Sequence, residues 1–311
     1  MAKAHIFISY AHEDKEWVLE GPGNIHLIPR IRRHTSPDAE IWFDEGLVIG
    51  EKWDYLWRTE EEYLEWSEKW IEEAARVLRM GGSFYLFGYF RMLSRLLPIL
   101  EKYGFELRQQ IVLNKGMQAA SGRATKNYRM FPNVTESILF LCKDSKPFAK
   151  SFLKQRQKEL GYSAKQINEM LGVKSNGGGM WSIYTGKNVC KQLPTEELWN
   201  KLQTILEFNI PYDKISQTYH AQMGLTDVWD DVNFYEEKDR IHPTQKPQKL
   251  LARLILASSD EDDIVLDPFM GGGSTALACI NNKRNYIGFE IEQEYYEKSL
   301  ERLACRQMTL F

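Results

Sequence analysis

The chain has 311 residues, of which 43% are hydrophobic and 27% are charged, with a formal net charge of -3 and a pI near 6.1. This composition supplies a core for two or three subdomains and argues against disorder, and the charge excludes a protein that simply coats nucleic acid. No apolar run approaches the roughly 18 residues of a membrane span. His12 and the acids after it come too early for a signal peptide. We therefore expect a soluble, cytoplasmic protein without a membrane segment.

The cysteines and histidines form no recognisable ligand set. Widely spaced thiols without a CxxC pair argue against both a zinc site and a disulfide framework. We therefore predict no metal site and no disulfide. The four cysteines are Cys142, Cys190, Cys279 and Cys305.

The first 53 residues predict two strands. "HIFISYAHEDKEWV" at 5–18 reads as a strand followed by a polar helix start, and "AEIWFDEGLVIGEKW" at 39–53 reads as a strand before an acidic loop. These strings resemble the beginning of a TIR domain, with Phe-Ile-Ser-Tyr in the first strand and Trp-x-Asp ending the second. The resemblance then stops, before the helix that carries the NAD-cleaving glutamate of that family. We therefore assign residues 1–53 to a TIR-like N-terminal fragment.

A long helix and three buried strands are predicted for residues 54–150. Apolar positions at helical spacing follow Thr59, a candidate N-cap, and we expect Gly81 and Gly82 to end this helix. "SFYLFG", "FELRQQIVLNKG" and "ESILFLCK" then read as strands. The stretch between the second and third of these strands contains no acids and is a candidate surface for nucleic acid, with a solvated face as the alternative. Its basic residues are Lys115, Arg123, Lys126 and Arg129.

Residues 151–219 are predicted to form a separate helical module. "YSAKQINEMLGV" has the rhythm of a helix-turn-helix and resembles the small helical repressor-type module. Preceding it, "KSFLKQRQK" at 150–158 is a second basic cluster, for which a solvated face is the alternative. A helical insertion can also serve packing alone. If this one contacts DNA, the candidates are Ser175, Asn176 and Trp181.

The C-terminal residues 220–311 contain a predicted βαβα unit. The strand that starts at Ile264 ends at Asp267, three glycines follow, and a second strand places Glu290 about 20 residues after them. In a doubly wound sheet this arrangement holds an adenosine, because the glycines let the ligand approach the backbone and the acid accepts hydrogen bonds from the ribose hydroxyls. "DPFMGGGST", "GFEI" and "YYEKSLERL" together closely resemble the S-adenosylmethionine site of amino-group DNA methyltransferases. "RIHPTQKP" at 240–247 resembles another signature of that family.

The resemblance implies an α/β fold, a doubly wound Rossmann-like methyltransferase sheet with an inserted helical module. The catalytic half, 54–150, precedes the cofactor half, 220–311, which is the order of the beta group. The family usually selects its DNA sequence with a segment at the place of the module. The implied S-adenosylmethionine-binding residues are Asp267, Pro268, Phe269, Gly271, Gly273, Ser274, Thr275, Glu290, His242, Thr244, Gln245 and Lys246.

The catalytic tetrapeptide of the family is missing from the sequence. Methyltransferases of this type flip the base and hold its amino group with Asp, Ser or Asn, followed by Pro-Pro and an aromatic residue. No such string occurs in the 311 residues, and "NIPY" at 209–212 reads as a loop. One substitute is that strand 40–43 takes the place of the lost strand and puts Asp44 at its end. Otherwise the catalytic residues are unknown.

Three functions stay open on the sequence. The first is methyl transfer from S-adenosylmethionine to an exocyclic amino group of double-stranded DNA, with adenine favoured over cytosine as the commoner target of this group. A restriction-modification system with a cognate endonuclease is the implied setting. The second is a cofactor-binding and DNA-binding remnant that has lost catalysis. The third is a TIR-type signalling or NAD-cleaving protein.

Overall fold

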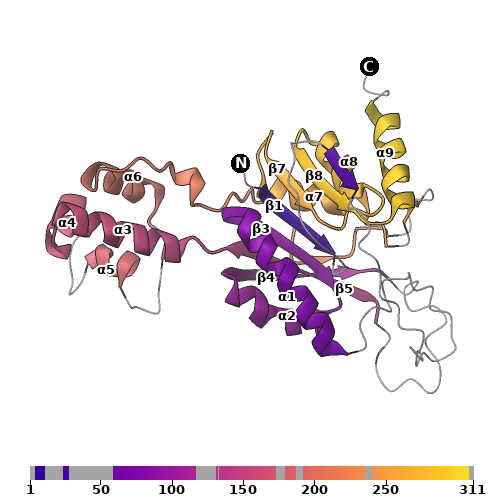
Figure 1. Ribbon diagram of the computed structural model, residues 1–311, viewed down its shortest axis with the longest axis horizontal. Coiled ribbons are helices and arrows are strands. Elements are labelled where there is room, and N and C mark those ends of the chain that lie inside the picture. The colour runs from indigo at the N-terminus through magenta and orange to yellow at the C-terminus, as the bar shows by residue number, and fades with distance from the viewer. Residues whose placement is uncertain are drawn as a thin grey trace.

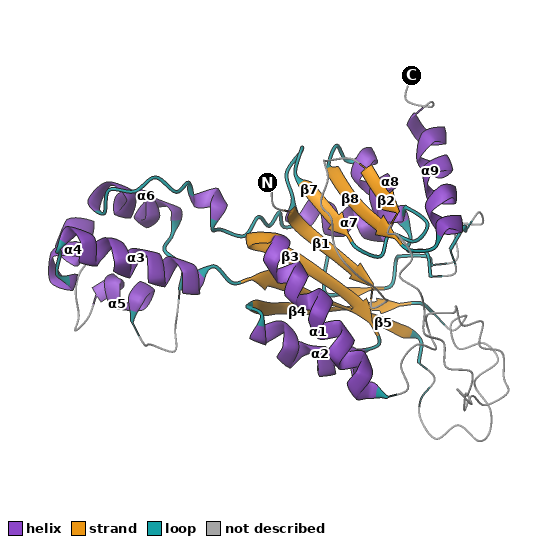
Figure 2. Cartoon of the chain, in the orientation of Figure 1, coloured by secondary structure: helices purple, strands orange, loops and turns teal. Residues whose placement is uncertain are grey.

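The structure is a computed structural model that describes residues 4–10, 24–27, 59–116, 131, 133–172, 179–186, 192–234, 240–242 and 244–307. Within these residues one mixed sheet has the strand order β2-β8-β7-β1-β3-β5-β4-β6 (Figures 1 and 2). The strands are β1 (Ala4–Tyr10), β2 (Asn24–Leu27), β3 (Leu78–Gly88), β4 (Phe105–Asn114), β5 (Thr135–Lys143), β6 (Val228–Trp229), β7 (Ile264–Asp267) and β8 (Asn285–Glu290). The helices are α1 (Glu60–Val77), α2 (Phe90–Lys102), α3 (Lys146–Leu160), α4 (Ala164–Leu171), α5 (Gly179–Thr185), α6 (Glu196–Ile205), α7 (Gln248–Ser258), α8 (Ser274–Asn281) and α9 (Gln293–Gln307), with a 3-10 turn η3 (Tyr212–Lys214).

The N-terminal strand β1 completes the centre of the sheet. It runs parallel to β3 on one side, where Ser9 pairs with Leu86, and to β7 on the other, where Phe7 pairs with Leu266. Without it, β3 and β7 would each leave a row of backbone groups unpaired inside the sheet. The proposal that strand 40–43 fills this place is therefore wrong, because residues 4–10 occupy it. Asp44 itself lies outside the described residues.

Helix α1 confirms the long helix predicted from residue 59, but its end differs from the prediction. The Thr59 side chain caps the helix by accepting from the Glu62 backbone N–H at 3.2 Å. The helix ends at Val77, and β3 runs straight through Gly81 and Gly82. A Cβ at Gly81 would lie 2.2 Å from the carbonyl oxygen of Ser216. This glycine thus serves a close backbone approach and does not end the helix.

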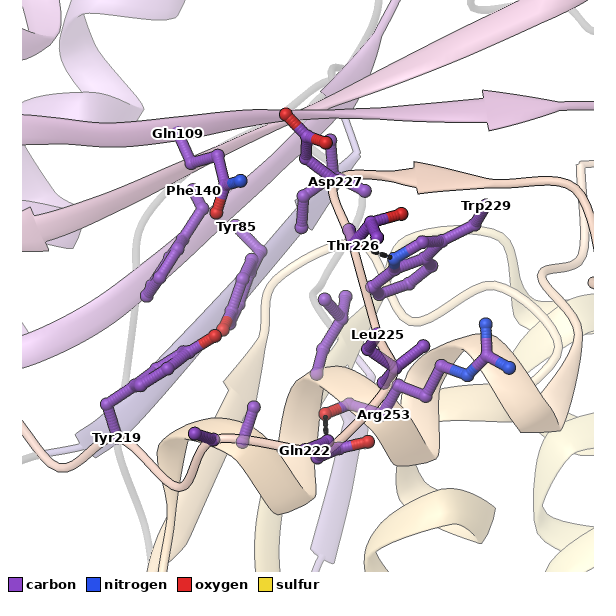
Figure 3. Close-up of a pocket in the computed structure, with 14 residues that line it drawn as sticks. Tyr85, Gln109, Phe140, Tyr219, Gln222, Leu225, Thr226, Asp227, Trp229 and Arg253 are labelled. Carbon is purple, nitrogen blue, oxygen red and sulfur yellow. Dashed lines mark hydrogen bonds between the residues drawn. The ribbon is translucent and has the colours of Figure 1, made fainter.

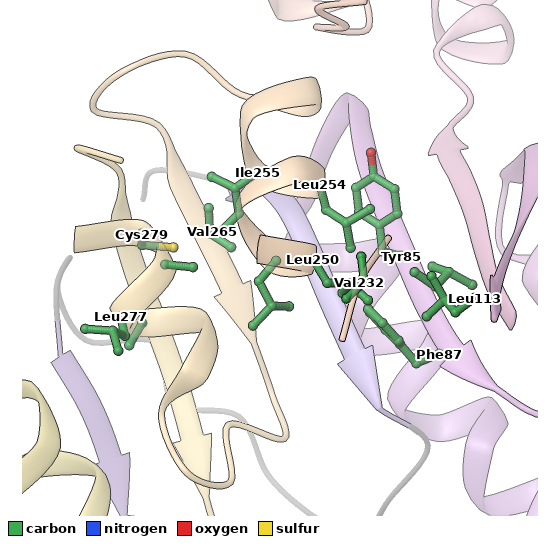
Figure 4. Packing of buried hydrophobic residues seen from close by; sticks show 14 of the residues in the cluster. Tyr85, Phe87, Leu113, Val232, Leu250, Leu254, Ile255, Val265, Leu277 and Cys279 are labelled. Atoms are coloured by element: carbon green, nitrogen blue, oxygen red, sulfur yellow. The ribbon is translucent and has the colours of Figure 1, made fainter. Parts of the chain in front are cut away.

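Alternate residues of the strands face two hydrophobic cores. Phe84 and Leu86 of β3 pack under α1 and α2, whereas Tyr85 and Phe87 pack under α7 and α8. Figure 4 shows the second of these cores between the strands and α7. Apolar residues on both sides of each strand are typical of a sheet covered on both faces, as the doubly wound prediction requires.

The helices α3 to α6 form a module with its own core, built around Trp199 and Trp181. Figure 1 shows this module beyond one end of the sheet. Helix α3 follows β5, whose last residues pair with the first residues of β4, and η3 lies against the start of β3. The module therefore adjoins the amino ends of the parallel strands. Because β7 and β8 end at Asp267 and Glu290, the glycine turn lies at the opposite edge of the sheet.

Buried Arg79 connects this module to the sheet. Its Nη1 atom donates to three backbone carbonyls, those of Met80 at 2.9 Å, Asp213 at 3.0 Å and Ser216 at 2.9 Å. Its Nη2 atom donates to Thr218 Oγ1 at 3.0 Å. These bonds hold the chain that returns from the module to the first residues of β3.

Two features are absent from the part of the chain that the structure describes. No helix there is long and apolar enough to cross a membrane. No group of three or more histidine, cysteine, aspartate or glutamate residues there is placed to hold a metal ion.

Candidate functional site

The turn between β7 and α8 is held by two buried carboxylates. Asp267 is 0% exposed, accepts from the Phe269 backbone N–H at 3.0 Å and is hydrogen-bonded by the Thr275 hydroxyl. Glu290, at the end of the neighbouring β8, accepts from the Gly271 backbone N–H at 2.7 Å. The predicted residues of the glycine turn and Glu290 thus come together at the carboxyl edge of the sheet.

Burial perturbs both acids. It raises the pKa of Asp267 to about 7, against hydrogen bonds from Thr275 and Phe269 that lower it. Burial also raises the pKa of Glu290, against backbone hydrogen bonds that lower it. Each carboxylate oxygen has two lone pairs, so Glu290 keeps acceptor capacity beside the bond from Gly271. It can therefore still accept a hydrogen bond from a hydroxyl group of a ligand.

The segment 240–247 packs directly on the glycine turn. Cβ atoms added to Gly271 and Gly272 would lie 3.3 Å from the His242 ring and 2.8 Å from the Ile241 side chain, so these positions admit no larger residue without movement. The His242 Nδ1 atom accepts from the Thr244 backbone N–H at 3.2 Å, and its ring contacts Tyr295. Burial, with a smaller effect of Lys246, lowers the pKa of His242 to about 4. His242 is therefore a neutral imidazole beside the turn.

The other predicted residues of the turn serve its packing. Phe269 contacts the rings of Trp66 and Trp70 of α1, with ring centroids 6.3 and 6.0 Å away. Pro268 is buried, and the Ser274 hydroxyl accepts from Arg302 at 3.1 Å. Gln245 accepts through Oε1 from the Ile241 backbone N–H at 3.2 Å. These contacts fix the shape of the turn.

Two predicted lysines meet at a buried acid that the sequence analysis did not single out. Glu136 of β5 pairs with Lys246 at 2.8 Å and with Lys115 at 3.3 Å. Burial alone would raise the pKa of Glu136, but the two lysine charges outweigh it and hold the pKa below its usual value. Lys246 also lies over the Phe87 ring, 5.5 Å from its centroid. Lys246 therefore joins the segment 240–247 to β5, and of the two lysines only Lys115 keeps substantial exposure, at 27% of its side chain.

The residues predicted to contact DNA have different outcomes. Trp181 is 3% exposed, in the core of the helical module, and its Nε1 atom donates to Gln157 at 3.2 Å. That prediction is wrong, because a ring packed on all sides cannot stack on a base. Trp181 is a core residue of the module instead. The remaining candidates, Arg123, Lys126, Arg129, Ser175 and Asn176, lie outside the described residues.

A cavity of about 280 Å³ lies between the sheet and α7, away from the glycine turn (Figure 3). A series of stacked rings lines it, with Tyr85 on Phe140 at 4.8 Å and Phe140 on Tyr219 at 5.8 Å between centroids. Tyr85 also hydrogen-bonds Ser258, at the end of α7, at 2.6 Å. Because α7 runs from the glycine turn towards the amino ends of the strands, this cavity is not part of the turn site.

The covered sheet, the glycine turn and the acid on the next strand define the class of doubly wound α/β proteins that bind a nucleotide-type cofactor. A family model described as DNA methylase (N6_N4_Mtase) matches residues 34–301, so the chain belongs to this family. The match begins upstream of the boundary predicted at residue 54, and β1 lies further upstream still.

Similarities to individual proteins are consistent with membership of this family. The Type II methyltransferase M.HpaI of Haemophilus parainfluenzae is 29% identical over 244 residues, which cover 78% of this chain and 59% of that protein. The DNA adenine methyltransferase YhdJ of Escherichia coli (strain K12) is 28% identical over 273 residues, covering 85% and 75%. The crystal structure of an M1.HpyAVI-SAM complex aligns with a TM-score of 0.51 and 19% identity, over 97% of this chain and 89% of that one, and this likeness supports the fold alone.

The chain is shorter than some of these relatives. It spans 59% of the length of M.HpaI and 56% of that of the Type II methyltransferase M.HinfI of Haemophilus influenzae. Activity, substrate and partners of this chain are therefore matters of proposal.

Proposed function

We propose that the chain binds S-adenosylmethionine at the glycine turn and transfers its methyl group to an exocyclic amino group of double-stranded DNA, with adenine as the base. The observation that carries the proposal is the meeting of Asp267, the glycine turn and Glu290 at one sheet edge, in a chain of the DNA methylase family. The adenine methyltransferase among the relatives supports the choice of base.

The donor set fits this cofactor. Glu290 has spare acceptor capacity for ribose hydroxyls, at the end of a strand beside the turn. Asp267 and Thr275 hold the turn in shape, and neutral His242 supports it from the other side without adding a charge. When bound, the cofactor supplies an electrophilic methyl group on a sulfonium. The chain itself has to hold a flipped base beside that edge and accept hydrogen bonds from its amino group.

The end of β1 is the place from which this acceptor is expected to come. Parallel strands β1 and β7 end at the same edge, and β1 extends through Ser9 and Tyr10 beyond the pairing of Phe7 with Leu266. Ser9 is a residue type that accepts hydrogen bonds. We infer that Ser9 is the first candidate acceptor, ahead of Asp44.

A second function is favoured by one specific observation. The sequence has no Asp-Pro-Pro-Tyr, Ser-Pro-Pro-Tyr or Asn-Pro-Pro-Tyr, and the serine of β1 is followed by tyrosine and alanine. Loss of this tetrapeptide would leave a protein that binds the cofactor and DNA without methyl transfer. A cognate restriction endonuclease and a sequence-reading role of residues 151–219 are further parts of the first proposal.

Transfer of labelled methyl from S-adenosylmethionine to duplex DNA of mixed sequence separates the two functions. After digestion to nucleosides, we expect the label in N6-methyladenine, and a strong loss in the Ser9→Ala variant but not in Asp44→Ala. Label in N4-methylcytosine would change the base. Calorimetric binding of the cofactor without any incorporation would support the second function and overturn the first.

A further inference from the structure

The helical module carries a hollow of about 380 Å³ between α3 and α5. Three lysines of α3, Lys146, Lys150 and Lys154, line one side of it, and Tyr184 of α5 and Gln192 line the other. Lysines four residues apart lie on one face of a helix, so all three side chains border the same space. Among the described residues that line the hollow there is no acid.

The three ammonium groups keep donors for a ligand. Lys150 donates to the Gly186 carbonyl at 2.8 Å, whereas Lys146 pairs with Glu106 at 2.8 Å and with Asp144 at 3.7 Å, outside the hollow. Within the described residues Lys154 has no ion pair. Each ammonium has three N–H donors, so the bonds to Gly186 and Glu106 leave donors unused.

A buried hydroxyl also lines the hollow. Tyr184 is 5% exposed, and within the described part of the chain its hydroxyl has no hydrogen-bond partner. A buried hydroxyl without a partner has lost its hydrogen bonds to water and gained none in return, which is unfavourable. Burial raises the pKa of Tyr184 to about 12, so the group is protonated and can donate. A ligand oxygen in the hollow would supply the missing acceptor.

We propose that this hollow binds a phosphate group, and that the group belongs to the backbone of DNA. Lysine ammonium groups bind phosphate as point charges, and hydroxyl and amide donors complete such a site. The proposal rests on the proposed function, because it takes DNA to be the substrate.

The position of the hollow determines which part of the DNA it would contact. The module adjoins the amino ends of the parallel strands, and β3, with its 11 residues, spans about 35 Å at 3.3 Å per residue. A phosphate bound here therefore lies far along the DNA from the target base at the carboxyl edge. Such a contact adds affinity without reading sequence, because phosphates are the same in every base pair.

The test is the salt dependence of DNA affinity for the double variant Lys150→Ala/Lys154→Ala. We expect the slope of log affinity against log salt to become shallower by about 1 to 2, since each neutralised phosphate contributes roughly 0.9. The matched control is Lys165→Ala/Lys201→Ala, which removes the same charge from exposed lysines of the same module that pair with Glu169 and Glu197. The control should keep the wild-type slope. Fluorescence anisotropy with an end-labelled duplex, without cofactor, measures both.

A second variant guards against loss of fold. Tyr184→Phe removes only the hydroxyl, so it should leave the unfolding midpoint unchanged or raised and weaken binding several-fold. Calorimetry with inorganic phosphate tests whether the hollow takes free phosphate. If the wild type binds phosphate, the lysine variant does not, and both have the same salt dependence of DNA affinity, the phosphate site is supported. The same result would overturn the proposal that the phosphate belongs to DNA. No phosphate binding and equal slopes in variant and control would overturn the whole inference. Because DNA binding is measured without methyl transfer, a wild-type chain that transfers no methyl would contradict the proposed function alone.

Discussion

Asp267 is a buried acid whose proton is coupled to folding. Burial raises its pKa from 3.8 to about 7 in the folded chain. The folded state then holds a proton that the unfolded chain has already lost, so this contribution to stability is full below about pH 4 and disappears as the pH rises through about 7. The effect is on the order of 4 kcal/mol.

Substitution Asp267→Asn tests this coupling, because asparagine keeps the size, can accept from Phe269 through its amide oxygen and donate to the Thr275 hydroxyl through its amide nitrogen, but cannot ionise. We expect the free energy of unfolding of the wild type to fall relative to that of the variant between pH 4 and pH 7. Urea unfolding at several pH values measures the difference. Parallel curves would show that Asp267 ionises freely in the folded chain.

Glu136 is a buried acid that pairs with two cations, Lys246 and the more exposed Lys115. Its side chain is 11% exposed and that of Lys246 is 10% exposed. Substitution Glu136→Gln removes the carboxylate shared by Lys246 and Lys115, and we expect it to reduce the free energy of unfolding by roughly 3 kcal/mol.

A matched control for this loss is Glu106→Gln. Glu106 also pairs with two cations, Lys146 at 2.8 Å and Arg108 at 3.3 Å, but its side chain is 37% exposed. The control should cost less than about 1 kcal/mol. Equal losses in urea unfolding at pH 7 would contradict the special role of Glu136.

The geometry of the glycine turn could be predicted from the sequence, whereas the role of Glu136 could not. Asp267, the glycines and Glu290 act through neighbours that are close in the sequence, so their spacing carries the signal. Glu136 acts through a lysine far along the chain. The available hint was an acid at the start of the apolar strand "ESILFLCK". Only the folded sheet brings it beside the segment 240–247.

Within β3, Gly81 joins the sheet to the chain returning from the module. Its φ is +71°, and a Cβ there would lie 2.2 Å from the Ser216 carbonyl oxygen. Gly104 has a similar φ of +83° but open space around the Cβ position. We expect Gly104→Ala to cost about 1 kcal/mol for backbone strain alone. Gly81→Ala should cost several times more, because Ser216 must also move.

Thermal or urea unfolding of the two glycine variants measures this difference. Similar losses in both would show that strain at positive φ explains the whole effect and that the contact with Ser216 does not matter. The sequence marked Gly81 only as a helix stop, since glycine commonly follows the last residue of a helix. The close approach could not be seen, because Ser216 is brought there by the fold of the intervening module.

At the scale of the whole molecule, the order of the two halves and the covered sheet were predicted correctly, and the centre of the sheet was not. The first residues resemble another kind of domain, so the sequence suggested that the methyltransferase sheet lacked strands. An apolar strand such as "HIFISY" can pair with any open neighbour, and its own sequence does not say which. In the structure it pairs with both β3 and β7. The cofactor edge and the helical module consequently lie at opposite ends of a complete sheet.

Hydrogen exchange of the β1 amides tests this account most directly, because the proposed site needs β1 between β3 and β7. Peptide-resolved exchange followed by mass spectrometry can compare residues 4–10 with residues 83–87 of β3, which pair with residues 6–10. We predict that both segments exchange slowly and lose protection together as denaturant is added. Fast exchange at residues 4–10 beside a protected β3 would contradict the account, because the sheet would then be open beside the cofactor turn.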